Sequence, residues 1–323
     1  MTDTGPLFVS SGKFLADRRY KWALDHAARG DFSGAADILA QTVELAPGFA
    51  TAWFALGAIR DQLGDREGAI AAFEKARDAD PEDCHGARLQ LARLGAGDLT
   101  PAMTTTYVRR LFDQYSERYD VALVEHLAYR GPELLRAAVE SVMGAAGRPM
   151  HFPSMLDLGC GTGLAGAAFR PVVDRLVGVD LSPGMIAQAA SKGLYDLLVT
   201  ADLAHFLAGE GADAAKYHLV VAADVFVYVN DLNPILAAIA RVLTPDGILA
   251  FTVETHPGGG VKLRPTLRYA HGHDLRVLLG AAALTTFHLG KTSVRNEKGA
   301  PVDSLVVVAQ PSTATRPPAS SGA

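Results

Sequence analysis

The chain has little cysteine, no long hydrophobic run and no strong excess of charge of either sign. Its 323 residues include only two cysteines, Cys84 and Cys160, which excludes a disulfide scaffold or a cysteine-rich zinc module and is typical of a reducing compartment. Its longest apolar runs, such as residues 219–223, are far too short for a membrane span, and residues 1–20 hold no apolar stretch of signal-peptide length. We therefore expect a cytoplasmic protein without a membrane segment.

The charge balance excludes a general affinity for polyanions. The 30 lysines and arginines stand against 35 aspartates and glutamates, and a net charge of −5 gives no drive toward nucleic acid or acidic membranes. With 49% hydrophobic and 20% charged residues, the chain can bury a sizeable core. Its length predicts two domains, since one domain typically holds roughly 100–200 residues.

The first third of the chain repeats itself. The pair Gly30-Asp31 recurs as Gly64-Asp65 and marks the turn between two helices, and Pro47 recurs as Pro81, all at an offset of 34 residues. Alanine and glycine between larger apolar residues at helical spacing allow two antiparallel helices to approach closely, and each proline ends a unit because it cannot continue a helix. The pattern therefore predicts stacked helical hairpins.

This pattern resembles the tetratricopeptide repeat, clearly in residues 50–83 and more weakly in residues 16–49. A further helix expected at residues 84–94 would cap the stack, and the resemblance implies a module over residues 14–95 with two repeats. Such modules often offer a groove to a protein partner, but two repeats and a cap can equally serve to support a second domain. The residues that carry the resemblance are Trp53, Leu56, Gly57, Ala69, Phe73, Ala76 and Pro81.

Residues 96–103 form a linker by their glycine, aspartate and proline content. After it, residues 104–131 predict a helix in which Leu111, Tyr115 and Tyr119 recur every four residues on one face. This stripe is either ordinary core or part of a lid over a ligand, and the choice between them depends on the motif that follows.

The strongest motif is a glycine-rich loop at the end of an apolar strand. Residues 153–158 predict a short strand that contains Asp157, and the loop Gly-Cys-Gly-Thr-Gly at residues 159–163 leads into a helical pattern. Glycine is needed there because the backbone turns sharply and has to approach a ligand closely. Cys160 has no base or cation beside it in sequence, so we interpret it as a spacer rather than a nucleophile.

The run Leu-Asp-Leu-Gly-Cys-Gly-Thr-Gly at residues 156–163 resembles the first motif of the class I, seven-stranded, Rossmann-like S-adenosylmethionine-dependent methyltransferases. Gly161, Gly163 and Gly166 also match a dinucleotide fingerprint formally, but the glycine that directly follows the strand is Gly159, which breaks that spacing. A carboxylate at the strand end also suits a cationic sulfonium with an ammonium group better than a pyrophosphate. The resemblance implies S-adenosylmethionine as cofactor, held near Asp157, Gly159, Cys160, Gly161 and Gly163.

Three later strands, predicted at residues 175–179, 197–200 and 217–222, end shortly before acidic residues, as they do in this family. An acid at the second strand end, Asp180, can accept hydrogen bonds from both ribose hydroxyls. The resemblance implies that Asp202 holds the adenine amino group, and that Asp224 lies at the fourth motif next to the transferable methyl group. It also adds Leu181, Met185 and Leu203 to the cofactor site, and it makes the helix with Tyr115 and Tyr119 a lid over the cofactor.

The end of the chain predicts a fifth strand and then a hairpin, which resemble the last three strands of the family. The final strand would run antiparallel to the rest, a topology that separates these enzymes from nicotinamide-binding folds. The expected ranges are 248–253 for the fifth strand, 285–293 and 304–310 for the hairpin strands, and 296–301 for the turn between them.

The methyl acceptor is less clear from the sequence. Residues 224–227 lack the Asn/Asp-Pro-Pro-aromatic signature of nucleic-acid amino methyltransferases, so a DNA acceptor is excluded. Residues 262–298 hold seven lysines and arginines against two acids, either as a solvated face or to bind an anionic acceptor through Arg264 or Arg268. His256 and His271 are weak candidates for a general base, and no residue cluster has the spacing of a metal site.

Together these patterns predict an α/β methyltransferase domain with a seven-stranded sheet over residues 104–310, preceded by the all-α repeat module and followed by a disordered tail at 311–323. The function implied is methyl transfer from S-adenosylmethionine to a small molecule or a protein. A repeat-containing adaptor with an inactive methyltransferase domain is the alternative.

Overall fold

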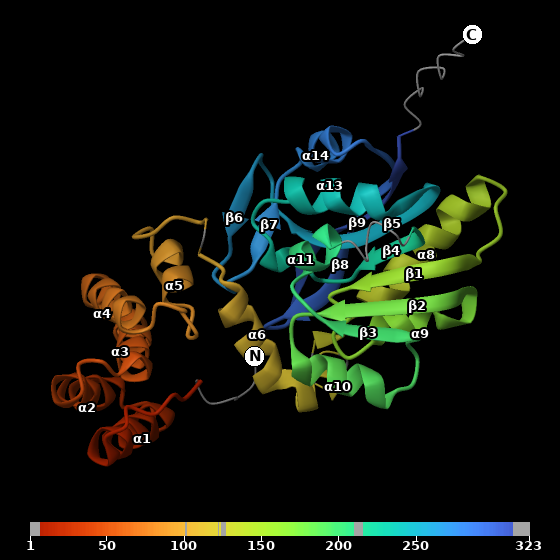
Figure 1. The fold of residues 1–323 in the computed structure, drawn as a ribbon. Helices are drawn as coiled ribbons and strands as arrows, with labels where there is room; N and C mark the ends of the chain where they lie inside the picture. The colour runs from red at the N-terminus through yellow and green to blue at the C-terminus, as the bar shows by residue number, and fades with distance from the viewer. Residues whose placement is uncertain (1–6, 101, 122, 124–126, 210–215, 313–323) are drawn as a thin grey trace, which may run out of the picture. The chain divides into compact units, whose positions relative to one another are not determined.

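The computed structural model describes residues 7–100, 102–121, 123, 127–209 and 216–312 (Figure 1). The chain divides into two compact units. The repeat unit comprises Met1–Gln114 with Leu263–Arg268, and the methyltransferase unit comprises Tyr115–Lys262 with Tyr269–Ala323.

The repeat unit consists of antiparallel helical hairpins. Its packed helices enclose buried Leu39, Phe49 and Leu56, with alanines at the close approaches between helices. Its helices are α1 (Phe14–Ala28), α2 (Phe32–Leu45), α3 (Ala50–Gln62), α4 (Arg66–Ala79), α5 (Ala87–Arg93) and α6 (Thr105–Tyr115).

The repeated Gly-Asp pair makes both hairpin turns. Gly30 and Gly64 have φ of 81° and 82°, a left-handed conformation that glycine adopts without strain. The aspartate after each glycine caps the next helix: Asp31 accepts a hydrogen bond from the Gly34 amide and Asp65 from the Gly68 amide, both at 2.9 Å. The period seen in the sequence is therefore a period of helix ends and starts.

The capping helix is shorter than expected. It begins at Ala87 instead of residue 84, because Asp83 and Gly86 both adopt positive φ and the chain turns before the helix starts. The Asp83 carboxylate then caps α5 by accepting from the Ala87 amide at 2.7 Å.

The methyltransferase unit is built on one mixed sheet. Strands β3, β2, β1, β4 and β5 pair in that order and run parallel, β9 pairs antiparallel with β5, and β8 pairs antiparallel with β9. This confirms the predicted seven-stranded sheet with an antiparallel last strand. The strands of this core are β1 (Phe152–Leu158), β2 (Val173–Asp180), β3 (Leu197–Thr200), β4 (Tyr217–Ala222), β5 (Leu243–Thr255), β8 (Leu284–Glu297) and β9 (Ala300–Pro311).

Two short strands were not expected from the sequence. β6 (Val261–Leu263) and β7 (Tyr269–His271) follow β5. β7 pairs in parallel with the carboxyl end of β5, where Ala270 lies opposite Glu254. The final hairpin is also tighter than predicted, since its strands extend to Glu297 and Ala300. The turn between them uses Lys298 and Gly299, which both have positive φ as a two-residue hairpin requires.

Helices cover both faces of the sheet (Figure 1). Successive residues of a strand pack on opposite faces: Met155 lies in the cluster with α8 and α9, and Leu156 lies in the cluster with α11, α13 and α14. These helices are α8 (Gly131–Ala145), α9 (Leu164–Phe169), α11 (Leu203–Ala208), α13 (Asn233–Val242) and α14 (Leu275–Ala281); α10 (Pro183–Ser191) follows β2.

The expected helix over residues 104–131 is interrupted. α6 ends at Tyr115, a single 3₁₀ turn follows at Ser116–Arg118, and α7 (Tyr119–Val121) is only one turn long. The prediction of one continuous face for Leu111, Tyr115 and Tyr119 was wrong, because a 3₁₀ turn has about three residues per turn and rotates Tyr119 off the α-helical stripe.

Candidate functional site

The glycine-rich loop lies where the parallel strands end. Gly159, Gly161 and Gly163 have φ of 65°, 53° and 92°, which confirms that this loop needs glycine for its conformation. A Cβ on Gly159 would lie 2.5 Å from a methyl group of Val225, whereas a Cβ on Gly161 would meet no atom within 4 Å. The backbone at Gly161 is therefore open to a ligand.

Asp180, at the end of β2, holds this loop in place. Its Oδ2 accepts from the Gly161 amide at 2.9 Å and its Oδ1 accepts from the Ser182 amide at 2.8 Å. The Ser182 hydroxyl in turn caps α10 by accepting from the Met185 amide at 3.0 Å. One carboxylate thus connects the loop after β1 with the helix after β2, and the structure joins two of the predicted site elements directly.

Asp157, near the end of β1, is completely buried. Its Oδ2 accepts a hydrogen bond of 2.7 Å from the Tyr195 hydroxyl, and its Oδ1 has no hydrogen-bond partner among the described residues. Burial raises the pKa of this carboxyl to about 7, with a further contribution from the negative charge of Asp180. A buried carboxylate oxygen without a partner is costly, and a cation beside it would remove that cost. This arrangement fits a cationic cofactor.

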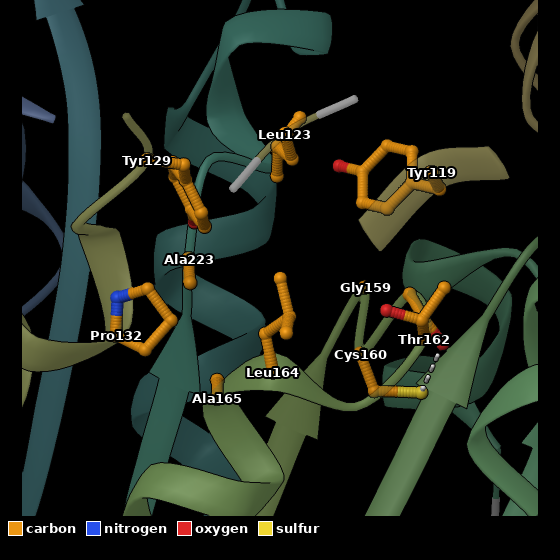
Figure 2. Close-up of a pocket in the computed structure, with 11 residues that line it drawn as sticks. Tyr119, Leu123, Tyr129, Pro132, Gly159, Cys160, Thr162, Leu164, Ala165 and Ala223 are labelled. Carbon is orange, nitrogen blue, oxygen red and sulfur yellow. Dashed lines mark hydrogen bonds between the residues drawn. The ribbon is translucent and has the colours of Figure 1, made fainter. Parts of the chain in front are cut away.

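A pocket of about 310 Å³, including its part open to solvent, lies beside the loop (Figure 2). All of its lining residues belong to the methyltransferase unit, and most are apolar or aromatic, as is usual for small-molecule sites. They are Tyr119, Leu123, Tyr129, Pro132, Gly159, Cys160, Gly161, Thr162, Leu164, Ala165 and Ala223.

The segment before α8 supplies one wall of this pocket. In Figure 2, Tyr119, Leu123 and Tyr129 stand opposite the loop residues. Asp120 ties the segment to the loop, because it accepts from the Thr162 hydroxyl and forms an ion pair of 2.6 Å with Lys192. Of the two tyrosines expected to form a lid, Tyr119 lines the pocket, and Tyr115 is absent from its lining among the described residues.

A buried arginine that the sequence analysis missed lies past the ends of β4 and β5. The Arg295 side chain, from β8, is fully inaccessible and donates to Asp224 and Glu254, with Glu297 3.5 Å from its Nε. Asp224 has a φ of 62°, and its amide donates to the Thr252 hydroxyl at 2.8 Å. Arg295 lies in the basic segment at residues 262–298, and nothing in its local sequence distinguishes it from the other cations there.

The remaining predicted cofactor residues lie near the ends of β2 and β3. Met185 is buried in the first turn of α10, and Asp202 caps α11 by accepting from the His205 amide at 3.0 Å. Leu181 and Leu203 are half-buried beside them. Cys160 is buried in the loop, and burial raises the pKa of its thiol, which keeps it protonated and agrees with a spacer role.

The predicted histidine bases lie outside the pocket lining in the described part of the chain. His271 is buried, its Nε2 lies 3.2 Å from the Phe226 carbonyl oxygen, and burial lowers its pKa. His256 has its Nε2 3.3 Å from the Gly260 carbonyl oxygen. Arg264 and Arg268 face each other across the turn between β6 and β7, where the Arg264 amide donates to the Arg268 carbonyl at 2.8 Å.

The residues that the structure describes hold neither a metal-binding cluster nor a membrane-spanning helix. They contain no cluster of three or more histidine, cysteine or acidic side chains placed to hold a metal ion. None of their helices is long and apolar enough to cross a membrane.

Comparison with known families assigns both parts of the chain. Residues 156–251 match the methyltransferase domain family, and residues 20–83 match the tetratricopeptide repeat family. Methyltransferase-like protein 27 of Homo sapiens is 43% identical over 79 residues, which cover 24% of this chain and 31% of that protein. The aligned part therefore spans about a third of the human relative.

Two solved methyltransferase structures are among those that this chain resembles. An S-adenosylmethionine-dependent methyltransferase from Clostridium acetobutylicum is 17% identical with a TM-score of 0.46, over 62% of this chain and 99% of that chain. The 1,6-didemethyltoxoflavin-N1-methyltransferase of Burkholderia thailandensis, with bound S-adenosylhomocysteine, is 22% identical with a TM-score of 0.48, over 64% and 87% of the two chains. Residues 156–251 therefore match the methyltransferase domain family, after a tetratricopeptide repeat match at residues 20–83, and the sheet order and the glycine-rich loop agree with the class I fold.

Proposed function

We propose that this chain transfers the methyl group of S-adenosylmethionine to a small molecule or a protein, and that its repeats dock a partner or support the catalytic unit. One observation carries the proposal. Beneath a glycine loop whose Gly161 backbone is open, one oxygen of the fully buried Asp157 carboxyl has no hydrogen-bond partner among the described residues. That combination suits a ligand that is cationic and packs closely on the backbone.

Each residue of the cofactor site has a distinct role in this proposal. Asp157 stabilises the positive charge at the methionine end of the cofactor, and residues 159–163 contact it through the backbone. Asp180 accepts hydrogen bonds from the ribose hydroxyls while it keeps its bond to the Gly161 amide, since a carboxylate can accept about four hydrogen bonds. Met185, Asp202 and Leu203 contact the adenine ring.

The catalytic step needs alignment more than it needs acid–base groups. The cofactor supplies an electrophilic methyl group with a good leaving group, the thioether of S-adenosylhomocysteine. Tyr119, Tyr129 and Leu123 enclose the pocket and exclude water, and the acceptor is held in line with the methyl group. An acceptor that carries a proton on its attacking atom releases it, and His256 and His271 remain the candidate bases.

The acceptor end of the site lies near Ala223 and Asp224. Ala223 lines the pocket, and the carboxylate of Asp224 is held beside it by Arg295. Arg264 and Arg268, which belong to the repeat unit, are proposed separately, as residues that can bind a carboxylate or phosphate. A radiolabelled methyl-transfer assay on fractionated cell extract would show whether the label enters protein or small molecules.

Calorimetry on the full chain with S-adenosylmethionine, S-adenosylhomocysteine and NAD tests the cofactor assignment. We expect the first two to bind and NAD not to bind, whereas an inactive adaptor that has lost its cofactor would bind none of them. Asp180→Ala should weaken cofactor binding by about 1–3 kcal/mol, or roughly 5- to 150-fold. Asp174→Ala, at the exposed opposite end of β2, is the matched control and should leave affinity unchanged. Unchanged affinity in the Asp180 variant would reject the assignment.

A further inference from the structure

Three glycines from different elements surround the ring of one tyrosine. A Cβ on Gly166, in α9, would lie 2.3 Å from the Tyr195 hydroxyl oxygen, and a Cβ on Gly178, within β2, would lie 2.7 Å from Cε1 of the same ring. Gly163 is nearly as close, at 3.0 Å from Cε2. Gly166 and Gly178 have no positive φ, so at these two positions packing and not the backbone conformation requires glycine: the Tyr195 ring at Gly166, and the ring together with Leu198 at Gly178.

The segment that carries Tyr195 is fixed to the sheet by its next residue. Asp196 accepts from the Leu176 amide at 2.7 Å, its own amide donates to the Leu176 carbonyl at 2.9 Å, and it pairs with Arg170 at 2.8 Å. The ring therefore enters the space between α9 and β2 from an anchored backbone. Its hydroxyl ends 2.7 Å from Oδ2 of Asp157.

We propose that Tyr195 is a positioning residue for cofactor binding, whose hydroxyl holds one oxygen of the Asp157 carboxyl and leaves the other available to the cation of the cofactor. The inference rests on the proposed function and deepens it. It also accounts for Gly166, the residue that completes the formal dinucleotide fingerprint, because that glycine makes room for the tyrosine hydroxyl instead of a pyrophosphate.

The groups around Asp157 set the pKa of its carboxyl, and the Tyr195 hydroxyl is one of them. Burial has the largest effect on the pKa of Asp157 and raises it, the hydrogen bond from Tyr195 lowers it, Asp180 in β2 raises it, and the backbone amide of Gly166 in α9 lowers it. Cys160 in the loop and Tyr129 before α8 are also within electrostatic range, and burial raises both of their pKa values, so both remain neutral at pH 7. Tyr195 itself keeps its proton, because burial and the Asp157 charge raise its pKa.

This arrangement predicts a pH dependence of cofactor binding. The Asp157 carboxyl has a pKa of about 7 in the folded chain without ligand, and a cation favours its ionised form. Affinity for S-adenosylhomocysteine should therefore rise as pH increases through about 7 and level off above it. Without the hydroxyl, the Asp157 pKa is higher still, so the transition should move to higher pH.

The test is calorimetry of S-adenosylhomocysteine between pH 5.5 and 8.5 on the full-length chain and its Tyr195→Phe variant. Phenylalanine keeps the ring among its glycines and removes only the hydroxyl. We expect roughly tenfold weaker binding at pH 7 and a transition moved up by about one pH unit. Tyr217→Phe, a buried tyrosine at the start of β4, is the matched control and should keep both values of the unaltered chain. Asp157→Asn should abolish the pH transition, because the transition is attributed to ionisation of the Asp157 carboxyl.

Gly166→Ala provides a second variant with an intact tyrosine, and it should move the transition in the same direction because the added methyl group displaces the hydroxyl. If the unaltered chain fails to bind S-adenosylhomocysteine, the proposed function fails. If it binds but Tyr195→Phe retains its affinity and transition, only the positioning role is overturned. Weaker binding without a moved transition also overturns that role, because it indicates that the tyrosine serves only packing.

Discussion

The repeat unit and the methyltransferase unit bury different kinds of side chains. In α1 to α4 the buried residues are apolar, apart from glycine, Tyr20 and two threonines. The repeat unit also buries Asp83 and His85, and the Asp83 carboxylate serves to cap α5. The methyltransferase unit buries Asp157, Asp180, Glu254 and Arg295 around the ends of its central strands. Burying charge opposes folding unless the charge is paired, so charges persist where a ligand or a reaction needs them. The two units therefore differ in their buried charge, which is concentrated at the strand ends of the methyltransferase unit, where the candidate site lies.

The two units can be followed separately during unfolding. Both tryptophans of the chain, Trp22 and Trp53, lie in the repeat unit, so tryptophan fluorescence reports on that unit alone. Far-UV circular dichroism reports on both. Denaturant titrations with both signals therefore show which unit a substitution affects.

Removing the buried cation should have the largest effect. Arg295→Met leaves Asp224 and Glu254 without their counter-charge inside the protein, and we expect a loss of about 3–5 kcal/mol in the free energy of unfolding of the methyltransferase unit. The circular-dichroism transition should move to lower urea while the fluorescence transition stays in place. Arg276→Met, an exposed arginine in α14, is the control and should change stability by under about 0.5 kcal/mol. If both substitutions changed the free energy of unfolding by the same small amount, buried charge would not distinguish the methyltransferase unit from the repeat unit.

Overpacking a close helix contact should have an intermediate effect in the repeat unit. A Cβ on Gly57 in α3 would lie 2.8 Å from the ring of Phe73 in α4. Gly57→Ala should cost about 1–3 kcal/mol in packing, offset by roughly 1 kcal/mol of helix propensity. The fluorescence transition should fall and cofactor affinity should stay unchanged. Gly48→Ala, whose added methyl group meets nothing within 4 Å, is the matched control. A stable Gly57→Ala variant would contradict the packing account.

Releasing the segment that carries Tyr119 should have the smallest effect. Asp120 is partly exposed, and ion pairs of this kind contribute about 0.2–1 kcal/mol. Asp120→Asn should weaken cofactor binding about two- to fivefold, and the difference from the unaltered chain should shrink at high salt. Asp78→Asn, which removes an exposed ion pair in α4, should leave binding unchanged. Equal binding by the Asp120 variant at low salt would show that this contact does not hold the pocket wall.

The sequence was most informative where a motif is local. The Gly-Asp pairs predicted both turns of the repeats, and the glycines at residues 159–163 predicted a sharp turn of the backbone, where the structure has positive φ. The strands at 197–200 and 217–222 were predicted with the bounds that the structure has. In each case the deciding interactions join residues a few positions apart, so the pattern is visible in the sequence.

The sequence was least informative about partners far apart in the chain. Arg295 reaches Asp224 from 71 positions away, and Tyr195 reaches Asp157 from 38 positions away. Gly178, a glycine within a buried strand, was the one sign of a close approach, but the approaching residue could not be inferred from it. The break after Tyr115 was also hidden, since helical periodicity continues through it.

The sequence by itself determined the resemblance to both families, the order of the motifs and the acids at the strand ends, because these follow from short patterns of glycine, aspartate and apolar spacing. Only the tertiary structure decided which charges are buried and which oxygen of Asp157 is left for a ligand. The physical reason is that desolvation depends on every element packed around a group, and those elements are distant in the chain.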